Sequence, residues 1–157
     1  MKIDLHVHSN NSDGKMSVKE IIAEAQDRGL NWLSITDHDS LAGQNEAMKN
    51  AEDAGINYVT GIELNVTFSE PEVKDGKEIS LDLLGYGYDV EYAPLIEKVK
   101  KIAEYRTERM KKIVEKLNGE FAKEGFALFT GEDVNLIQES ADGAVGRPHI
   151  AKYLIKK

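Results

Sequence analysis

All four histidines of this chain lie in short polar segments, three of them beside carboxylates. The segment DLHVHS alternates in polarity, so an extended strand would carry His6 and His8 on the same face. Two neighbouring imidazoles can bind one cation, and neutral imidazole is the commonest metal ligand in proteins. Asp13 follows in a loop that can bring its carboxylate back towards that face. We therefore predict a metal site here; the alternative is an exposed edge strand whose histidines share no ligand.

Three further apolar runs lead into, or contain, a candidate ligand. The runs span residues 31–35, 56–60 and 79–84. His38 follows the first run, Glu63 follows the second, and Asp82 lies inside the third. In α/β folds, sites are built where strands end, and a carboxylate within an apolar run is costly unless it is paired or binds a metal. We predict that these residues join the metal site; solvent-facing or ion-paired carboxylates remain the alternative for Glu63 and Asp82.

The segment GRPH near the end of the chain indicates an anion site. Pro148 suits the first turn of a helix, which places Arg147 at the helix entry, where free backbone amides favour an anion. A guanidinium group adds two parallel hydrogen bonds to a phosphate. We predict that Arg147 and His149 contact a substrate phosphate; the alternative is a capped helix start with an exposed arginine.

The elements that must position these residues alternate along the first half of the chain. Ser17 and Glu20 form a capping-box pattern that predicts a helix to about residue 28, and Gly29 is a typical stop. A second helix is predicted from residue 40 or 41 to residue 54. The resulting βαβαβ order predicts a largely parallel sheet. The charged segment 71–76 predicts a hairpin between the third and fourth strands.

The second half of the chain is predicted to be helical. From residue 92 to about 123, apolar residues recur at steps of three or four, which predicts one long amphipathic helix that Gly125 ends. A short extended piece at 126–130 and another helix from Gly131 are predicted to follow. Arg106 and Arg109 can reach a substrate from the long helix, although charged residues on such helices usually face water. The alternative for this half is a helical hairpin with no role beyond packing.

Five segments, in this order, resemble the motifs of the PHP (polymerase and histidinol phosphatase) domain family, in particular its stand-alone metal-dependent phosphoesterases. The segments are MKIDLHVHSNNSDG, SITDHDSLAG, GIELNV, LLGYGYD and GRPHIA. The resemblance implies an α/β fold of the distorted (β/α)7 barrel type, with up to three divalent metals at the C-terminal ends of the strands. It also implies that metal-ligand positions are occupied by His6, His8, Asp13, His38 and Glu63.

The chain departs from that family pattern in two respects. Asp82 stands where the family usually has a histidine, and a carboxylate favours a harder cation. The family's later ligands do not appear before Lys157, so we expect the N-terminal part of a longer protein, nearly inactive by itself. Residues 1–91 would form the first βα units of a partial barrel, and residues 92–157 a helical insertion over its mouth. Uncovered strand edges and apolar surface then favour a homodimer.

The mixture of histidines and carboxylates suits Mn²⁺, Fe²⁺ or Zn²⁺ better than Mg²⁺. Because such ions acidify bound water and clamp phosphate oxygens, we predict a phosphoesterase with Asp13, His38 and Asp37 as catalytic residues. Asp37 and Asp39 are candidates to orient the ligands. The family resemblance implies nucleotides or short oligonucleotides as substrates. The alternatives are a histidinol-phosphate-type phosphatase, a metallohydrolase of other substrates, and an inactive binding or accessory domain.

Composition limits the remaining function classes. A length of 157 residues with 41% apolar residues suits one globular domain. The formal net charge of −8 argues against an extended nucleic-acid or anionic membrane surface, so any nucleotide contact should be local. The absence of cysteine excludes disulfides and thiolate metal sites, and favours a cytoplasmic protein. No apolar run approaches the ~18 residues of a membrane-spanning helix, so we predict no membrane anchor.

Overall fold

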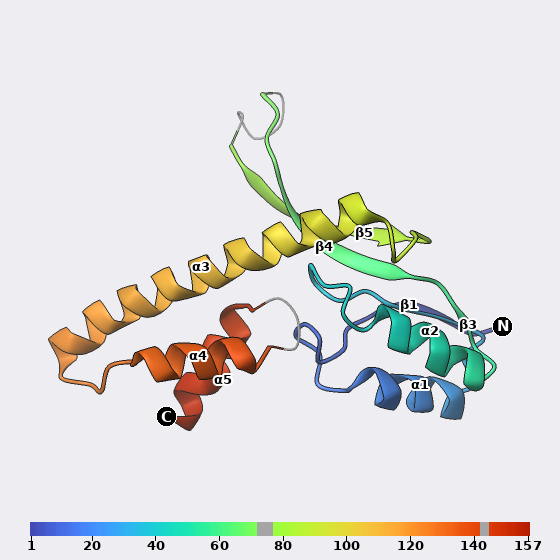
Figure 1. The fold of residues 1–157 in the computed structure, drawn as a ribbon, viewed down its shortest axis with the longest axis horizontal. Coiled ribbons are helices and arrows are strands. Elements are labelled where there is room, and N and C mark those ends of the chain that lie inside the picture. The colour runs from blue at the N-terminus through green and yellow to red at the C-terminus, as the bar shows by residue number, and fades with distance from the viewer. Residues whose placement is uncertain (72–76, 142–144) are drawn as a thin grey trace.

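The computed structural model of this α/β protein describes residues 1–71, 77–141 and 145–157 (Figure 1). Its strands lie in the first part of the chain, and the part after them is helical. In chain order, the elements are β1 (Ile3–Val7), α1 (Val18–Asp27), β2 (Trp32–Ile35), α2 (Gln44–Asp53), β3 (Asn57–Tyr58), β4 (Gly61–Phe68), β5 (Ile79–Tyr86), α3 (Ala93–Glu124), α4 (Gly131–Glu139) and α5 (Arg147–Lys156).

The first three strands form a parallel sheet in the order β1-β2-β3, and α1 and α2 pack against it. The capping box predicted for α1 is confirmed, because the Ser17 hydroxyl accepts the Glu20 amide and the Glu20 carboxylate accepts the Ser17 amide at 2.7 Å. The predicted stop is also confirmed, since Gly29 has a left-handed φ of 67°. The core between these elements consists of Val18, Ile21, Ile22, Ala25, Leu33, Ile35, Ala47, Ala51 and Ile56.

The second helix begins at Gln44, three or four residues later than predicted, after a turn that Leu41 closes by accepting the Gln44 amide at 3.1 Å. The Gln44 side chain is 1% exposed and joins the parallel sheet to β4. Its Nε2 donates to the carbonyls of Ile35 and Gly61, both at 2.9 Å. Its Oε1 accepts from the Tyr58 hydroxyl at 3.0 Å and from the Gly61 amide at 3.2 Å. The side-chain amide of Gln44 therefore supplies hydrogen bonds between β2 and β4 that a backbone ladder would otherwise make.

Replacing Gln44 by Leu is expected to lower the free energy of unfolding by about 2 kcal/mol, because buried backbone groups of Ile35 and Gly61 lose their partners. Urea unfolding followed by circular dichroism measures the change. Gln26→Leu on the exposed side of α1 is the matched control. An unchanged midpoint for Gln44→Leu would show that these groups find other partners.

The parallel sheet predicted from the βαβαβ order is confirmed for β1, β2 and β3, and the strands that follow are antiparallel, as the predicted hairpin requires. β4 and β5 form an antiparallel ribbon, paired from Gly61 with Tyr86 to Phe68 with Ile79. Of the third strand predicted at 56–60, only the two residues of β3 form a strand, and the longer strand begins at Gly61. β4 pairs with β5 along its whole length, and its apolar residues Ile62, Leu64, Val66 and Phe68 alternate with Glu63, Asn65 and Thr67. The hairpin turn predicted at 71–76 lies outside the described residues from position 72 on.

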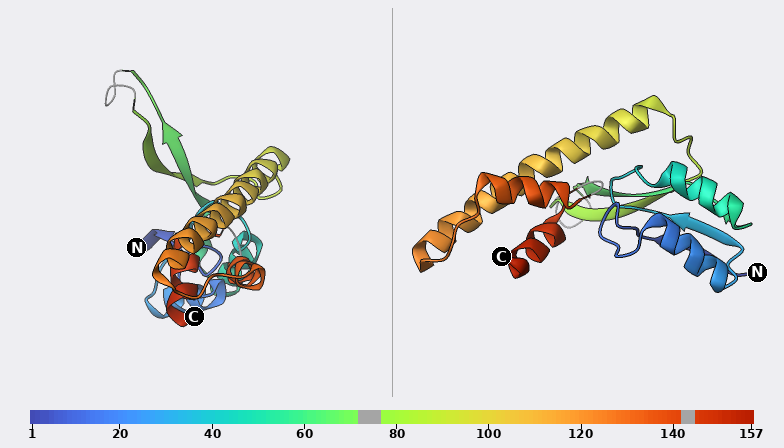
Figure 2. Two further views of the ribbon diagram at one scale, coloured as in Figure 1. Left: turned by 90° about the vertical axis from the view of Figure 1, so that its left-hand side faces the viewer. Right: turned by 60° about the horizontal axis from the view of Figure 1, so that its bottom comes forward.

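The long helix α3 crosses the ribbon and continues to α4 and α5 (Figures 1 and 2). As predicted, Gly125 ends it with a left-handed φ of 73°. The second half of the apolar stripe of α3 packs within the chain, against α4 and α5. The homodimer and the domain boundary between residues 91 and 92 stay predictions. This second core consists of Met110, Val114, Phe129, Ile137, Val145 and Ile150.

Residues 126–130 lie outside any strand. Asn118 of α3 holds them instead, since its side chain accepts the Phe129 amide at 2.7 Å and donates to the Phe129 carbonyl at 2.9 Å. Within the described ranges, the two sheets do not close into a barrel. Among the helices described, none combines the length and apolar character needed to cross a membrane.

Candidate metal centre and adjoining cavity

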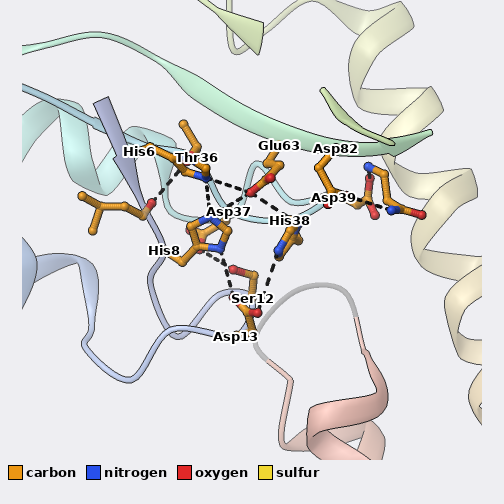
Figure 3. A network of polar contacts seen from close by, with 12 residues as sticks. His6, His8, Ser12, Asp13, Thr36, Asp37, His38, Asp39, Glu63 and Asp82 are labelled. Atoms are coloured by element: carbon orange, nitrogen blue, oxygen red, sulfur yellow. Dashed lines mark hydrogen bonds and ion pairs between the residues drawn. The ribbon is translucent and has the colours of Figure 1, made fainter. Parts of the chain in front are cut away.

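Glu63 lies at the centre of the histidine cluster, where β1, β2 and β4 meet (Figure 3). Its Oε2 atom is 3.1 Å from His6 Nε2, 2.8 Å from His8 Nε2 and 3.6 Å from His38 Nδ1. The Nε2 atoms of His6 and His8 are 3.1 Å apart, so both imidazoles lie on one side of β1. The Glu63 side chain is only 8% exposed. A buried carboxylate among three imidazoles is a donor arrangement that a divalent cation satisfies.

Asp13 extends this cluster from the loop after β1. Its carboxylate lies 2.9 Å from His8 Nδ1 and 3.8 Å from His38 Nε2. Partial burial raises the pKa of Asp13, but the hydrogen bond from His8 and the charge of His38 outweigh that effect and leave the pKa below its usual value. The carboxylate is therefore held in its ionised, ligating form.

Asp82 reaches the cluster from β5. One carboxylate oxygen accepts from Asn65 Nδ2 at 2.8 Å, and the side chain lies near His38 and Glu63. The cluster divides into three overlapping groups, in each of which the ligand atoms lie within 4.8 Å of one another. The groups are His6, His8 and Glu63; His8, Asp13 and His38; and His38, Glu63 and Asp82. Shared members suit the site to more than one cation.

Backbone hydrogen bonds between strand ends fix the spacing of these ligands. His38 and Glu63 form an isolated parallel bridge, in which the Glu63 amide donates to the Asp37 carbonyl at 3.2 Å and the Asp39 amide donates to the Glu63 carbonyl at 2.9 Å. β1 and β2 are joined nearby, because the Thr36 amide donates to the Val7 carbonyl at 2.8 Å. Three strands that are distant in sequence thus bring their polar ends to one place.

Asp37 lies beside the ligand cluster and binds the loop after β1. Its carboxylate is 1% exposed and accepts from the Ser9 amide at 2.7 Å and from the hydroxyls of Ser9 and Ser12, both at 2.6 Å. These bonds hold the loop that presents Asp13. The structure thus places Asp37, predicted as a catalytic residue, against the supporting loop.

Asp39 has a partner that sequence reasoning did not identify. It adopts a left-handed φ of 49° and is 2% exposed. Its carboxylate accepts the Asn65 amide at 3.1 Å and forms an ion pair with Arg106 of α3. For Arg106, contact with a substrate and exposure to water were the predicted alternatives, and the structure pairs it with Asp39 instead. Nothing in the local pattern of either residue signals a partner 67 positions away.

A cavity of about 390 Å³ adjoins the cluster. Asp13, His38 and Asp82 line it from the side of the ligand cluster, and Arg106, Arg109 and Arg147 line it from the helices. Asp13 and Asp82 therefore lie in the same cavity as three arginines, two on α3 and one on α5. Such a cavity can hold an anion beside bound cations.

His149 lies at the start of α5 and lines the same cavity. Its Nδ1 accepts the Gly146 amide at 3.1 Å, so in the neutral imidazole the proton is on Nε2. Burial lowers the pKa of His149, and the positive charge of Lys152 lowers it further. His149 can therefore donate a hydrogen bond to a ligand, while the exposed Arg147 supplies charge.

The donor set fits a first-row divalent metal. Three imidazoles and three carboxylates supply nitrogen and oxygen in the mixture that Mn²⁺, Fe²⁺ and Zn²⁺ accept. The buried Glu63 carboxylate contacts the imidazole of His6 at 3.1 Å, and the Nε2 atoms of His6 and His8 are crowded to the same distance from each other. Coordination of one ion by all of them removes this crowding.

The sequence of this chain is similar to a known protein family and to several of its relatives. The model of the PHP domain matches residues 4–116. A 5'-3' exoribonuclease from Haemophilus influenzae is 31% identical over 158 residues, which cover 99% of this chain and 51% of the relative. A 3',5'-nucleoside bisphosphate phosphatase from Chromobacterium violaceum is 34% identical over 111 residues, which cover 71% of this chain and 36% of the relative.

The fold has solved counterparts as well. An amidohydrolase from Chromobacterium violaceum, determined with bound sulfate and no metal, is 27% identical with a TM-score of 0.75. The similarity covers 99% of this chain and 50% of that structure. The chain therefore spans about half the length, or less, of these relatives.

Proposed function

From the premise that this chain belongs to the PHP domain family, we propose that it serves metal-dependent hydrolysis of phosphate esters in nucleotides or short oligonucleotides. One observation carries the proposal: potential metal ligands and three arginines, of which Arg106 is paired with Asp39, line the same cavity of about 390 Å³. A phosphate ester is the substrate class that needs cations on its reacting oxygens and guanidinium groups on the others. The relatives described as an exoribonuclease and a nucleoside bisphosphate phosphatase support nucleotide substrates.

The metal would be held by the residues of the cluster around Glu63. We infer Mn²⁺, Fe²⁺ or Zn²⁺, because imidazoles and carboxylates contribute together. Such a cation supplies Lewis acidity, which makes the phosphorus more electrophilic and water more acidic. The ligands would be His6, His8, Asp13, His38, Glu63 and Asp82.

The other residues of the site bind and orient the substrate. Arg147 would neutralise the phosphate through its guanidinium group, and His149 would donate from Nε2, because Nδ1 already accepts the Gly146 amide. Asp13 and His38 line the cavity and would meet both metal and reacting phosphate. Asp37 would act indirectly, by holding the Ser9 to Asp13 loop in place.

The fold supports the same proposal. A parallel βαβαβ unit and a TM-score of 0.75 to the amidohydrolase structure, of which this chain covers 50%, are consistent with part of a distorted (β/α)7 barrel. The helices α3, α4 and α5 would then form the insertion over its mouth. In barrels of this type, the ligands gather at the C-terminal ends of the strands.

The test uses the natural protein that carries these residues, loaded with Mn²⁺. We expect phosphate release from AMP, a nucleoside bisphosphate or a 5'-phosphorylated oligonucleotide, and loss of release after chelation of the metal. Histidinol phosphate as the only substrate would favour that alternative. Metal binding without release from any ester would favour an accessory domain.

One substitution tests the proposed contact between Arg147 and the substrate phosphate. Arg147→Gln is expected to raise KM for the phosphate ester by about tenfold or more, because a charge-assisted bidentate contact is lost. Metal content should not change. Arg28→Gln, which removes an exposed arginine paired with Glu24 on α1, is the matched control. An unchanged KM for Arg147→Gln would assign the residue to helix capping alone.

A further inference from the structure

The ribbon of β4 and β5 carries an amide side chain next to two candidate metal ligands. Glu63 and Asn65 are two residues apart on β4 and therefore lie on the same face of the strand. Asp82 of β5 is paired in register with Asn65, so its side chain lies on that face as well. Asn65 and Asp82 both line the cavity of about 390 Å³. The ribbon thus places Asn65 beside the ligands without making it one of them.

The Asn65 side chain holds the Asp82 carboxylate. Its Nδ2 donates to Asp82 Oδ1 at 2.8 Å and to the Ser80 hydroxyl at 3.1 Å. The backbone of Asn65 is fixed in turn, because its amide donates to the buried Asp39 carboxylate at 3.1 Å. A carboxylate that accepts one such hydrogen bond keeps further lone pairs for a cation. Asp82 is therefore oriented but still able to bind a metal.

The three ligand groups of the cluster differ in the atoms that they offer. The group of His38, Glu63 and Asp82, here called the oxygen-rich group, supplies one imidazole and two carboxylates, whereas each of the other two groups supplies two imidazoles and one carboxylate. Figure 3 shows His6 and Asp82 on opposite sides of Glu63. Carboxylates and water suit Mn²⁺, and imidazoles suit Zn²⁺. The two sides of the cluster therefore suit different cations.

Charge and exposure also favour a hard cation in the oxygen-rich group. The ligand atoms of Glu63 and Asp82 lie within 4.8 Å of each other, and two negative charges at that distance repel. A divalent cation bound by both carboxylates removes the repulsion. Asp82 is exposed and lines the cavity, which leaves room for the water ligands that hard cations such as Mg²⁺ retain.

We propose that Asn65 is a positioning residue that orients Asp82 for a hard divalent cation, so that the preference for Zn²⁺ over Mn²⁺ is weaker in the oxygen-rich group than in the other two groups. This inference rests on the metal binding of the proposed function and assigns different cations to parts of one cluster. Asn65 acts through Asp82, because a hydrogen bond to a ligating carboxylate fixes its direction towards the metal.

The test uses the natural protein that carries these residues, freed of metal by chelation. It is given two equivalents of Zn²⁺ and titrated with Mn²⁺, whose unbound fraction is read from its electron paramagnetic resonance signal. We expect Mn²⁺ to bind without release of Zn²⁺, which elemental analysis after gel filtration checks. Asn65→Leu, which keeps the side-chain volume, should lower the Mn²⁺ affinity by at least about tenfold and leave the bound Zn²⁺ unchanged. Asn45→Leu, at an exposed position of α2, is the matched control and should bind Mn²⁺ as the wild type does.

A second substitution tests the choice of cation. Asp82→His should raise the ratio of Zn²⁺ affinity to Mn²⁺ affinity in the oxygen-rich group by about tenfold or more, because an imidazole replaces a carboxylate. The Zn²⁺ concentration that displaces bound Mn²⁺ measures this ratio. A residue that only supports the ribbon would affect both ions alike. Equal losses of Zn²⁺ and Mn²⁺ in Asn65→Leu, or an unchanged ratio in Asp82→His, would overturn the proposal.

The outcomes separate this inference from the proposed function. Wild-type Mn²⁺ affinity in Asn65→Leu overturns the positioning role alone, because phosphate release by the wild-type protein would still support hydrolysis. A wild-type protein that binds neither Zn²⁺ nor Mn²⁺ overturns both. Selective loss of Mn²⁺ in Asn65→Leu, without phosphate release from any ester by the wild type, supports the positioning role and overturns the hydrolytic function.

Discussion

Replacing Glu63 by Gln is expected to lower the affinity of the protein for Mn²⁺ or Zn²⁺ by at least about a hundredfold. The Oε2 atom of Glu63 lies within 3.6 Å of nitrogens from three histidines, so this oxygen faces every imidazole of the cluster. An amide of equal size removes the negative charge that offsets the cation. Titration calorimetry with each metal, and elemental analysis of purified protein, measure the loss.

The same substitution should leave the fold intact, because Gln fills the Glu63 volume and can hydrogen-bond to the imidazoles. Circular dichroism checks this point. Glu52→Gln, at an exposed position of α2, is the matched control and should bind metal as the wild type does. Wild-type metal affinity in Glu63→Gln would show that the cluster is not the metal site.

Replacing Arg106 by Met is expected to lower the free energy of unfolding by about 3–5 kcal/mol, because it leaves the Asp39 carboxylate buried without its counter-charge. Asp39 is 2% exposed, and among the described residues its carboxylate would retain the hydrogen bond from the Asn65 amide. The pair also ties α3 to the loop that carries His38. Urea unfolding measures the destabilisation, and Arg109→Met, one turn away in the same cavity, is the control.

A second substitution tests whether the buried charge is the cause. Asp39→Asn combined with Arg106→Met should recover most of the lost stability, because the uncompensated carboxylate is gone and Asn tolerates the left-handed φ of 49°. If the double variant is as unstable as Arg106→Met, the loss comes from packing of the arginine side chain instead. A wild-type midpoint in Arg106→Met would mean that the pair is absent in solution.

Much of the local structure was readable from the sequence because its causes are local. Ser17 and Glu20 cap α1 through groups three residues apart, and Gly125 ends α3 through its own left-handed φ. The ligand types were likewise recognisable. His6 and His8 share a face because side chains alternate along a strand, whatever its neighbours are.

The second half of the sheet was predicted only in part. β4 alternates between apolar Ile62, Leu64, Val66 and Phe68 and polar Glu63, Asn65 and Thr67, but the third strand was placed at residues 56–60. β4 exists as a strand because β5 supplies eight paired residues across an antiparallel ladder. Gln44 is the first residue of α2, and nothing in the local sequence indicates a special role for it. Its side chain joins the ribbon to the parallel sheet because Ile35 and Gly61 lie beside it in the folded protein.

By itself, therefore, the sequence determined the chemistry available to this protein: histidines and carboxylates at strand ends, and an arginine and histidine at a helix start. These follow from residue type and spacing along the chain. The tertiary structure alone decided which carboxylates face the imidazoles and which support them. Asp37, Asp39 and Glu63 are all acids near strand ends, but their roles depend on partners in distant segments: Ser9, Arg106 and His8. Contacts between such segments depend on how strands and helices pack, which spacing along the chain does not encode.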